Sequence, residues 1–194
     1  MTCSRRRSIS SATYLDPPSV RRIVVTGGPG AGKSAMLSQI ERQGYRVMED
    51  SARKIIRQRK RQGLSARPDA ARFALNILAD EIQDYESAKP ARSDLVFFER
   101  GILDALCMLA QIPEHSVDIE SCIERYPYHD TVFILPPWRE IYRQDEERDQ
   151  SYEDAVRVHA QIRHWYADCG HRLIEVQPDS IDARCAFVLG ALEP

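Results

Sequence analysis

The chain has 194 residues, of which 43% are hydrophobic and 29% are charged, and its net charge is -2 at pH 7. These values fit one compact domain, and the near balance of charge gives no reason to expect a nucleic acid or an anionic membrane as an obligatory partner. No apolar run approaches the ~20 residues that a membrane-spanning helix needs, and five cysteines without a CxxC pair argue against a disulfide framework and for a reducing, cytoplasmic location.

The first 20 residues differ in composition from the rest of the chain. They contain Arg5-Arg6-Arg7, many serines and Pro17-Pro18, but not the apolar core of a secretory signal. So few apolar side chains cannot offset the entropy that is lost when a segment becomes ordered. We therefore expect a disordered tail over residues 1–20, followed by a single folded domain over residues 21–194.

From Arg22 onward, short apolar strands alternate with helices. Strands are expected at residues 23–25, 45–48, 95–98, 131–135 and 172–176. Helices are expected at about residues 32–43, 51–61, 68 to at least 82, 102–109, 151–165 and 182–192. This alternation predicts an α/β fold in which a parallel sheet carries helices on both faces.

A glycine-rich loop joins the first strand to the first helix. Residues 27–34 match the pattern GxxxxGK[ST] without a mismatch, in the context that this phosphate-binding loop requires. Its backbone N–H groups and the helix N-terminus should hold the phosphates of ATP, with Lys33 on the β- and γ-phosphates and the Ser34 hydroxyl as a Mg²⁺ ligand. The expected ATP-binding residues are Gly28, Pro29, Gly30, Ala31, Gly32, Lys33, Ser34 and Ala35.

Acidic residues follow the second and third strands, where ligands of a parallel sheet bind. Glu99, after four apolar residues, fits the Walker B pattern and is the expected second Mg²⁺ residue. Glu49 is the candidate general base for a hydroxyl acceptor, although it could instead cap the next helix, for which Asp50 is the better candidate. Arg100 could contact the transferred phosphoryl group or the acceptor; the alternative is a salt bridge to a neighbouring acid.

An arginine-rich segment follows the fourth strand. Arg139 and Arg143 are four residues apart and would share one face of a helix. We expect them, ahead of Arg148, to belong to a lid that closes over ATP, excludes water and stabilises transition-state charge. The alternative is a solvated helix whose arginines pair with the acids around them, because residues 140–147 include four acidic side chains.

Together, the phosphate loop, the turn Glu99-Arg100-Gly101 and the arginine segment resemble P-loop small-molecule kinases over about residues 22–190. Such kinases include deoxyribonucleoside kinases and the nicotinamide riboside kinase part of NadR-type proteins. The chain is most similar to the small AAA-type ATPase domains that are grouped with NadR. Deoxyribonucleoside kinases have Glu-Arg-Ser at this turn, so Gly101 departs from their pattern and leaves deoxynucleoside specificity open.

This resemblance implies a three-layer P-loop NTPase fold with a five-stranded parallel sheet in the order 2-3-1-4-5. It also implies a base role for Glu49, a Mg²⁺ and substrate role for Glu99 and Arg100, and lid roles for Arg139 and Arg143. With Lys33 of the phosphate loop, Glu49, Arg100, Arg139 and Arg143 are the expected catalytic residues. The adenine ring would stack near the loop of residues 177–180, after the fifth strand.

The leading functional hypothesis is an ATP- and Mg²⁺-dependent kinase for a small, nucleoside-like acceptor. The alternative is an ATPase, or a nucleotide-gated binding module, with no transfer substrate. A GTPase is disfavoured because the chain lacks an Asn-Lys-x-Asp segment. No membrane partner is expected and nucleic acid is an unlikely one, because the basic run 57–61 has no interleaved aromatic residues. An oligomer is compatible with the sequence.

Overall fold

The computed structural model describes residues 20–66, 68–113, 115–143 and 150–193. Apart from residue 20, the expected tail therefore lies outside the described residues. No helix in the described part of the chain is long and apolar enough to cross a membrane.

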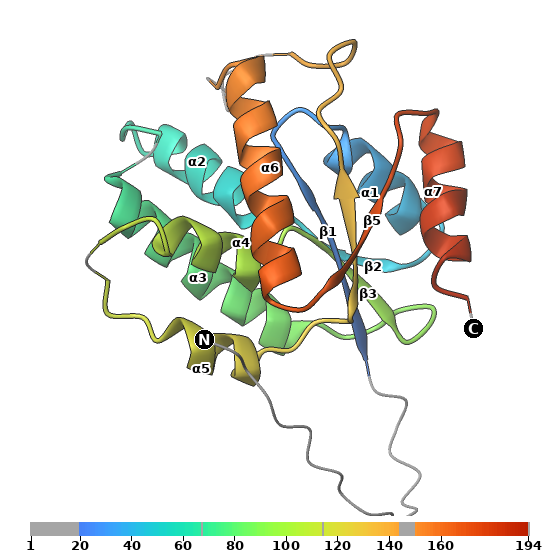
Figure 1. The fold of residues 1–194 in the computed structure, drawn as a ribbon, viewed down its shortest axis with the longest axis horizontal. Coiled ribbons are helices and arrows are strands. Elements are labelled where there is room, and N and C mark those ends of the chain that lie inside the picture. Colours follow the sequence, from blue (N-terminus) through green and yellow to red (C-terminus); the bar gives the residue numbers. More distant parts are fainter. Residues whose placement is uncertain (1–19, 67, 114, 144–149, 194) are drawn as a thin grey trace, which may run out of the picture.

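Five parallel strands form one sheet, in the order β2-β3-β1-β4-β5 (Figure 1). Their bounds are Arg21–Gly27 for β1, Arg46–Met48 for β2, Leu95–Glu99 for β3, Thr131–Leu135 for β4 and Arg172–Glu175 for β5. Both the fold class and the strand order implied by the resemblance are confirmed, and each expected strand lies within two residues of its observed ends.

Helices cover both faces of this sheet, as expected (Figure 1). Their bounds are Lys33–Arg42 for α1, Ser51–Arg61 for α2, Ala70–Ser87 for α3, Ile102–Leu109 for α4, Ile119–Arg125 for α5, Tyr152–Asp168 for α6 and Ile181–Gly190 for α7. The sequence pattern did not predict α5, which buries none of its residues fully and is too short for a clear helical period.

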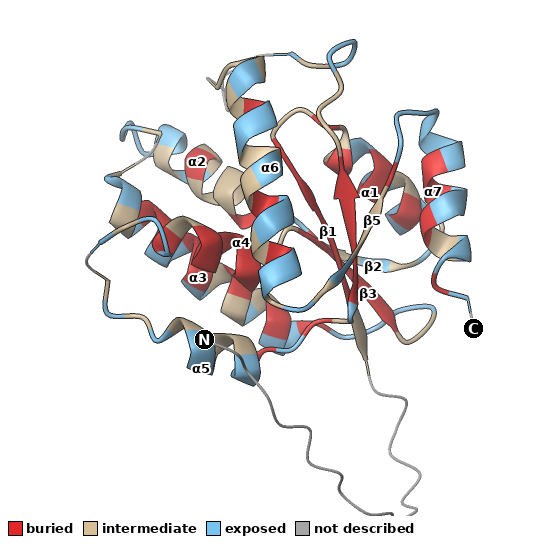
Figure 2. Cartoon of the chain, in the orientation of Figure 1, coloured by how far each residue is buried: buried red, intermediate tan, exposed pale blue. Residues whose placement is uncertain are grey.

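Side chains along each central strand alternate between two apolar clusters. In β3, Leu95 and Phe97 pack in the cluster under α1 and α7, whereas Val96 and Phe98 pack in the cluster under α2, α3, α4 and α6. Figure 2 shows the buried strands between helices whose outer faces are exposed. This alternation decides on which side of the sheet each functional residue beyond a strand end lies.

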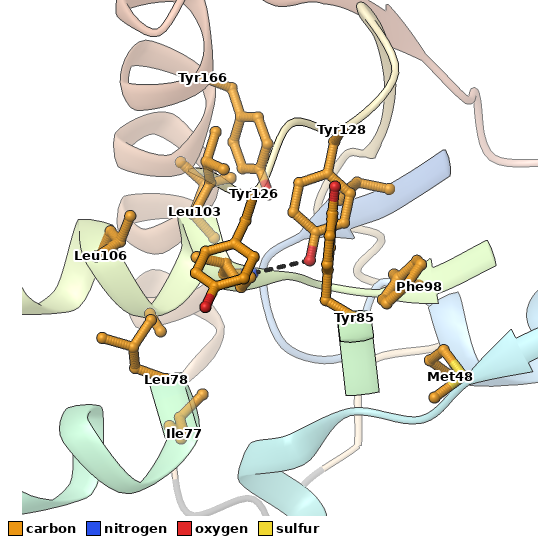
Figure 3. Packing of buried hydrophobic residues seen from close by; sticks show 14 of the residues in the cluster. Met48, Ile77, Leu78, Tyr85, Phe98, Leu103, Leu106, Tyr126, Tyr128 and Tyr166 are labelled. Atoms are coloured by element: carbon orange, nitrogen blue, oxygen red, sulfur yellow. Dashed lines mark hydrogen bonds between the residues drawn. The ribbon is translucent and has the colours of Figure 1, made fainter. Parts of the chain in front are cut away.

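Four tyrosines lie in the larger cluster together with Phe98 (Figure 3) and Phe73. The rings of Tyr85 and Tyr128 meet edge to face at 5.3 Å, and the Tyr128 hydroxyl accepts a hydrogen bond from the backbone N–H of Ile102 at 3.3 Å. A Cβ atom on Gly101 would lie 2.9 Å from that hydroxyl oxygen. The buried tyrosine thus explains why glycine, and no larger residue, fits this turn.

Gly27, at the end of β1, lies against the backbone of β4, and this close approach can be tested by substitution. It has a φ of 130°, and a Cβ atom there would lie 2.4 Å from the backbone oxygen of Leu135. Gly27→Ala should therefore lower the free energy of unfolding by about 2–4 kcal/mol in urea denaturation. Gly190→Ala is the matched control, because a Cβ atom at position 190 would have no neighbouring atom within 4 Å. This substitution should leave the free energy of unfolding unchanged or raise it by up to ~1 kcal/mol. Equal effects would contradict the steric explanation.

Candidate active site

The phosphate loop curls between β1 and α1 as its sequence predicts. Gly30 and Gly32 have φ angles of 78° and 82°, a backbone conformation that glycine adopts without steric cost. The Lys33 side chain is only 5% exposed, and its ammonium group donates to the carbonyl oxygens of Gly27 at 3.1 Å and Gly28 at 2.8 Å. The loop backbone therefore accepts two hydrogen bonds from the lysine and holds its ammonium group next to the phosphate-binding amides.

The charge of Lys33 is poorly stabilised in this environment. Burial, and after it the nearby Arg100 guanidinium, lower the pKa of Lys33 from 10.5 to about 7. Glu99, Asp50 and Asp104 act in the opposite direction but do not cancel this effect. An anionic ligand on the loop would supply the missing negative charge, as a triphosphate does.

Ser34 and Glu99 meet on the α1 side of the sheet. The Ser34 hydroxyl donates to the buried Glu99 carboxylate at 2.7 Å. Magnesium prefers oxygen ligands and is usually held by one or two protein groups together with substrate phosphates and water. The two expected Mg²⁺ residues thus lie together at the edge of the phosphate loop, and their chemistry fits that ion.

Glu49 lies on the same side of the sheet as Glu99. Both residues line a cavity of about 200 Å³ together with Ser34, Arg53 and Arg57. The Glu49 side chain is 70% exposed and pairs with Arg57 at 3.1 Å. It is therefore accessible to a ligand in the cavity.

Asp50 lines the same cavity and caps α2, as the sequence predicts. One of its carboxylate oxygens accepts the backbone N–H groups of Ala52 at 2.9 Å and Arg53 at 3.3 Å. The other oxygen lies 3.4 Å from the Arg100 guanidinium. The two adjacent acids after β2 thus differ: Glu49 is exposed, whereas the Asp50 carboxylate is committed to a helix cap and an arginine.

Arg100 lies between two acids, with 18% of its side chain exposed. Its guanidinium pairs with Asp50 at 3.4 Å and with Asp104 at 3.1 Å. Burial alone would lower the pKa of Arg100, but the carboxylates around it raise that pKa above its ordinary value. The salt bridge that was the alternative for Arg100 is therefore present; a contact with a phosphoryl group or an acceptor stays a prediction.

Asp104 was not recognised from the sequence as a site residue. It is 5% exposed and accepts hydrogen bonds from Thr26 at 2.6 Å and from Tyr166 at 2.7 Å. An acid at the third residue of an apolar helix is the one local sign that this residue is unusual. Its donors, Thr26 and Tyr166, are 78 and 62 residues away in the chain. Only the fold brings them together.

The described part of the arginine segment, residues 138–143, lies against the phosphate loop. The Tyr142 ring leaves no room for a side chain on Gly30, since a Cβ atom there would lie 2.4 Å from the ring, and Ile141 approaches Gly32. The backbone N–H of Tyr142 bonds to the Trp138 carbonyl at 3.1 Å, which closes a single turn and not the regular helix that would align the arginines. Residues 144–149, and with them Arg148, lie outside the described residues.

The contacts given by the described residues join the two lid arginines to residues 140, 142 and 152. The Arg139 guanidinium stacks on the Tyr152 ring at 5.1 Å. Arg143 donates to the carbonyl oxygens of Glu140 at 3.2 Å and Tyr142 at 2.8 Å. Their role over ATP therefore stays a prediction.

A second cavity, of about 140 Å³, lies beside the loop that follows β5. Its lining includes Gln177, Asp179 and Arg184, which is only 4% exposed. The Arg184 guanidinium donates to the carbonyl oxygen of Ala31 at 3.4 Å and lies 5.3 Å from the Trp138 ring. The sequence analysis pointed to this loop but missed Arg184, which connects it with the phosphate loop.

A glycine-rich phosphate loop on a parallel sheet of this order, with an acid at the end of β3, defines a P-loop nucleotide-binding domain. Residues 22–184 match the family described as an AAA domain. The chain therefore belongs to the AAA domain family. A search of curated proteins found no match.

Several solved kinase structures are similar to this fold. Deoxyadenosine kinase from M. mycoides with bound dATP has a TM-score of 0.59 at 14% identity, over 88% of this chain and 98% of that chain. Thymidylate kinase from Candida albicans has a TM-score of 0.59 at 13% identity, over 90% and 91% of the two chains. Shikimate kinase from Aquifex aeolicus has a TM-score of 0.53 at 15% identity, over 88% and 95%. At these identities the likeness establishes the fold.

The low pKa of Lys33 predicts a pH dependence of stability. The unfolded chain keeps the lysine proton up to about the ordinary pKa of 10.5, whereas the folded chain releases it at about 7. Between these values the unfolded chain binds more protons, so the free energy of unfolding should rise with pH. The destabilising effect of the buried charge is complete below pH 7 and disappears as the pH rises.

Lys33→Met should remove this dependence. In buffer containing EDTA, the stability of the wild type relative to the variant should increase from about pH 7 to about pH 10, by at most about 1.4 kcal/mol per pH unit. Chemical denaturation at a series of pH values measures the difference. Parallel pH profiles for the two proteins would show that Lys33 keeps an ordinary pKa.

Proposed function

We propose that the chain is an ATP- and Mg²⁺-dependent kinase that transfers the γ-phosphoryl group to a small, nucleoside-like hydroxyl acceptor. The observation that carries this proposal is the convergence of Lys33, Ser34, Glu99 and Glu49 at one edge of the sheet. A phosphate loop alone supports nucleotide binding. A carboxylate open to a ligand in the same cavity adds the group that an acceptor hydroxyl requires.

Each residue has a distinct part in the proposed reaction. The loop amides and Lys33 bind the phosphates, and Glu49 accepts the proton of the acceptor hydroxyl. Arg100 and the lid residues Arg139 and Arg143 offset charge on the transferred group when nucleotide is bound. Magnesium, when bound by Ser34 and Glu99, would neutralise charge on the phosphate oxygens.

The adenine ring would occupy the cavity beside the loop after β5. Arg184 and Trp138 lie between this cavity and the phosphate loop, so an aromatic base could stack there while its phosphates reach Gly32. The similar structures are kinases of a deoxynucleoside, a thymidylate and shikimate, which favours a small-molecule acceptor without selecting one. The four cysteines of the described residues are free, which favours a cytoplasmic location.

A hydrolytic ATPase is the second candidate. The exposure of Glu49 favours it, because a water molecule can reach this carboxylate as readily as a hydroxyl acceptor can. Water exclusion would then depend on lid closure. Turnover with and without acceptors separates the two functions: a compound that stimulates ADP release without free phosphate indicates transfer, whereas equal ADP and phosphate release with every compound indicates hydrolysis.

Lys33→Ala tests nucleotide binding. The substitution removes the cation next to the phosphate amides, and we expect calorimetry to detect no uptake of ATP in the presence of Mg²⁺. Ser38 lies on α1, lines the neighbouring cavity and has no assigned role. The Ser38→Ala variant should therefore bind ATP like the wild type. Normal ATP binding by Lys33→Ala would remove the lysine from the mechanism.

Glu49→Gln tests proton transfer. It retains the size of the side chain but not the base, so ATP binding should persist while the rate of phosphoryl transfer falls about 10²–10⁴-fold. Glu41→Gln makes the same chemical change in the same cavity, away from the strand end, and should leave the rate within about twofold of the wild type. A normal transfer rate for Glu49→Gln would assign Glu49 a structural role.

A further inference from the structure

The backbone at Arg100 is held in a conformation that it would not adopt unaided. Its φ is 70°, and no other non-glycine residue among those described has a positive φ. This conformation is unfavourable for a residue with a side chain and persists only where the surroundings fix it. The backbone N–H of Arg100 bonds to the Val25 carbonyl at 3.0 Å, and its guanidinium reaches back to α4.

On α4, the Arg100 guanidinium donates to Asp104, whose carboxylate is itself held by several hydrogen bonds. One oxygen accepts from Thr26 at 2.6 Å and Arg100 at 3.1 Å, and the other accepts from Tyr166 at 2.7 Å and the Gly101 backbone at 3.1 Å. Each oxygen of this carboxylate therefore accepts two hydrogen bonds. Because β1, the turn after β3 and α6 each supply donors, Asp104 cannot turn away without losing bonds to all three.

Asp50, the other acid beside Arg100, is less suited to this function. Its distance to the guanidinium is 3.4 Å, and its second oxygen is committed to the cap of α2. Asp104 is therefore the better anchored of the two partners, and it is the one held by buried hydroxyl groups.

Arg100 also lies close to the phosphate-binding lysine. The guanidinium is near enough to Lys33 to oppose its protonation, and Asp104 acts on both cations in the opposite direction. Without a triphosphate, the charges of Lys33 and Arg100 repel each other. A buried carboxylate between β1 and α4 allows both to remain there.

We infer that Asp104 is a positioning residue for phosphoryl transfer, which holds the Arg100 guanidinium in place beside the phosphate loop through the hydrogen bonds of Thr26 and Tyr166. This inference rests on the proposed kinase function for its kinetic consequence. Its structural content, that Asp104 fixes Arg100, does not depend on that function.

The kinetic test is a double-mutant cycle. Asp104→Asn should lower kcat at least about tenfold while KM for ATP stays within about threefold, because Arg100 acts on the transferred group. In an Arg100→Ala background the same substitution should have little further effect on kcat. Asp84→Asn, which disrupts a salt bridge to Lys54 in the same way, should leave kcat unchanged. Equal losses with and without Arg100 would overturn the inference.

The second test needs no acceptor. The ¹⁵N–¹H signals of the Arg100 Nη groups, assigned with Arg100→Lys, should shift and exchange faster with solvent in Asp104→Asn, but not in Asp84→Asn, because Nη1 donates to Asp104. If Asp104→Asn fails to fold, Thr26→Val removes one donor to the same carboxylate and should shift the signals by a smaller amount. Unchanged signals would refute the positioning role, whereas absent transfer with shifted signals would refute only the kinase proposal.

Discussion

The side-chain alternation of β2 and β3 is the constraint on which the site depends. Consecutive residues at the ends of these parallel strands point to opposite faces of the sheet. Glu99, the last residue of β3, therefore lies with Ser34 on the α1 side of the sheet. Arg100 follows with a positive φ and pairs with Asp50 and Asp104, so the turn after β3 supplies charged groups to both sides of one phosphate site.

This division brings opposite charges together below the phosphate loop. Lys33 is buried and Arg100 is partly buried, and neither could keep its charge in an apolar surrounding without acids nearby. The carboxylates of Asp50, Asp104 and Glu99 meet this requirement from three different elements. The same arrangement leaves Lys33 with a lowered pKa, which the negative charge of a polyphosphate on the loop would raise.

The sequence predicted those features that are encoded locally. The phosphate loop is contiguous, and Asp50 caps a helix that begins at the next residue, so both were found correctly. The strand order followed from the resemblance. Asp104 and Arg184 were missed because their partners are distant in sequence, and the reason for Gly101 required the position of the Tyr128 hydroxyl. The expected alignment of Arg139 and Arg143 assumed a helix, whereas the described segment is a single turn.

The contact between Tyr142 and Gly30 joins the arginine segment to the phosphate loop. The ring lies where a side chain at position 30 would have to be, so an aromatic residue at 142 and anything but glycine at 30 exclude each other. Because Gly30 also has a φ of 78°, a smaller residue at position 142 would not by itself admit a side chain at position 30. A loop with a side chain there would need both a smaller residue at 142 and a different backbone conformation.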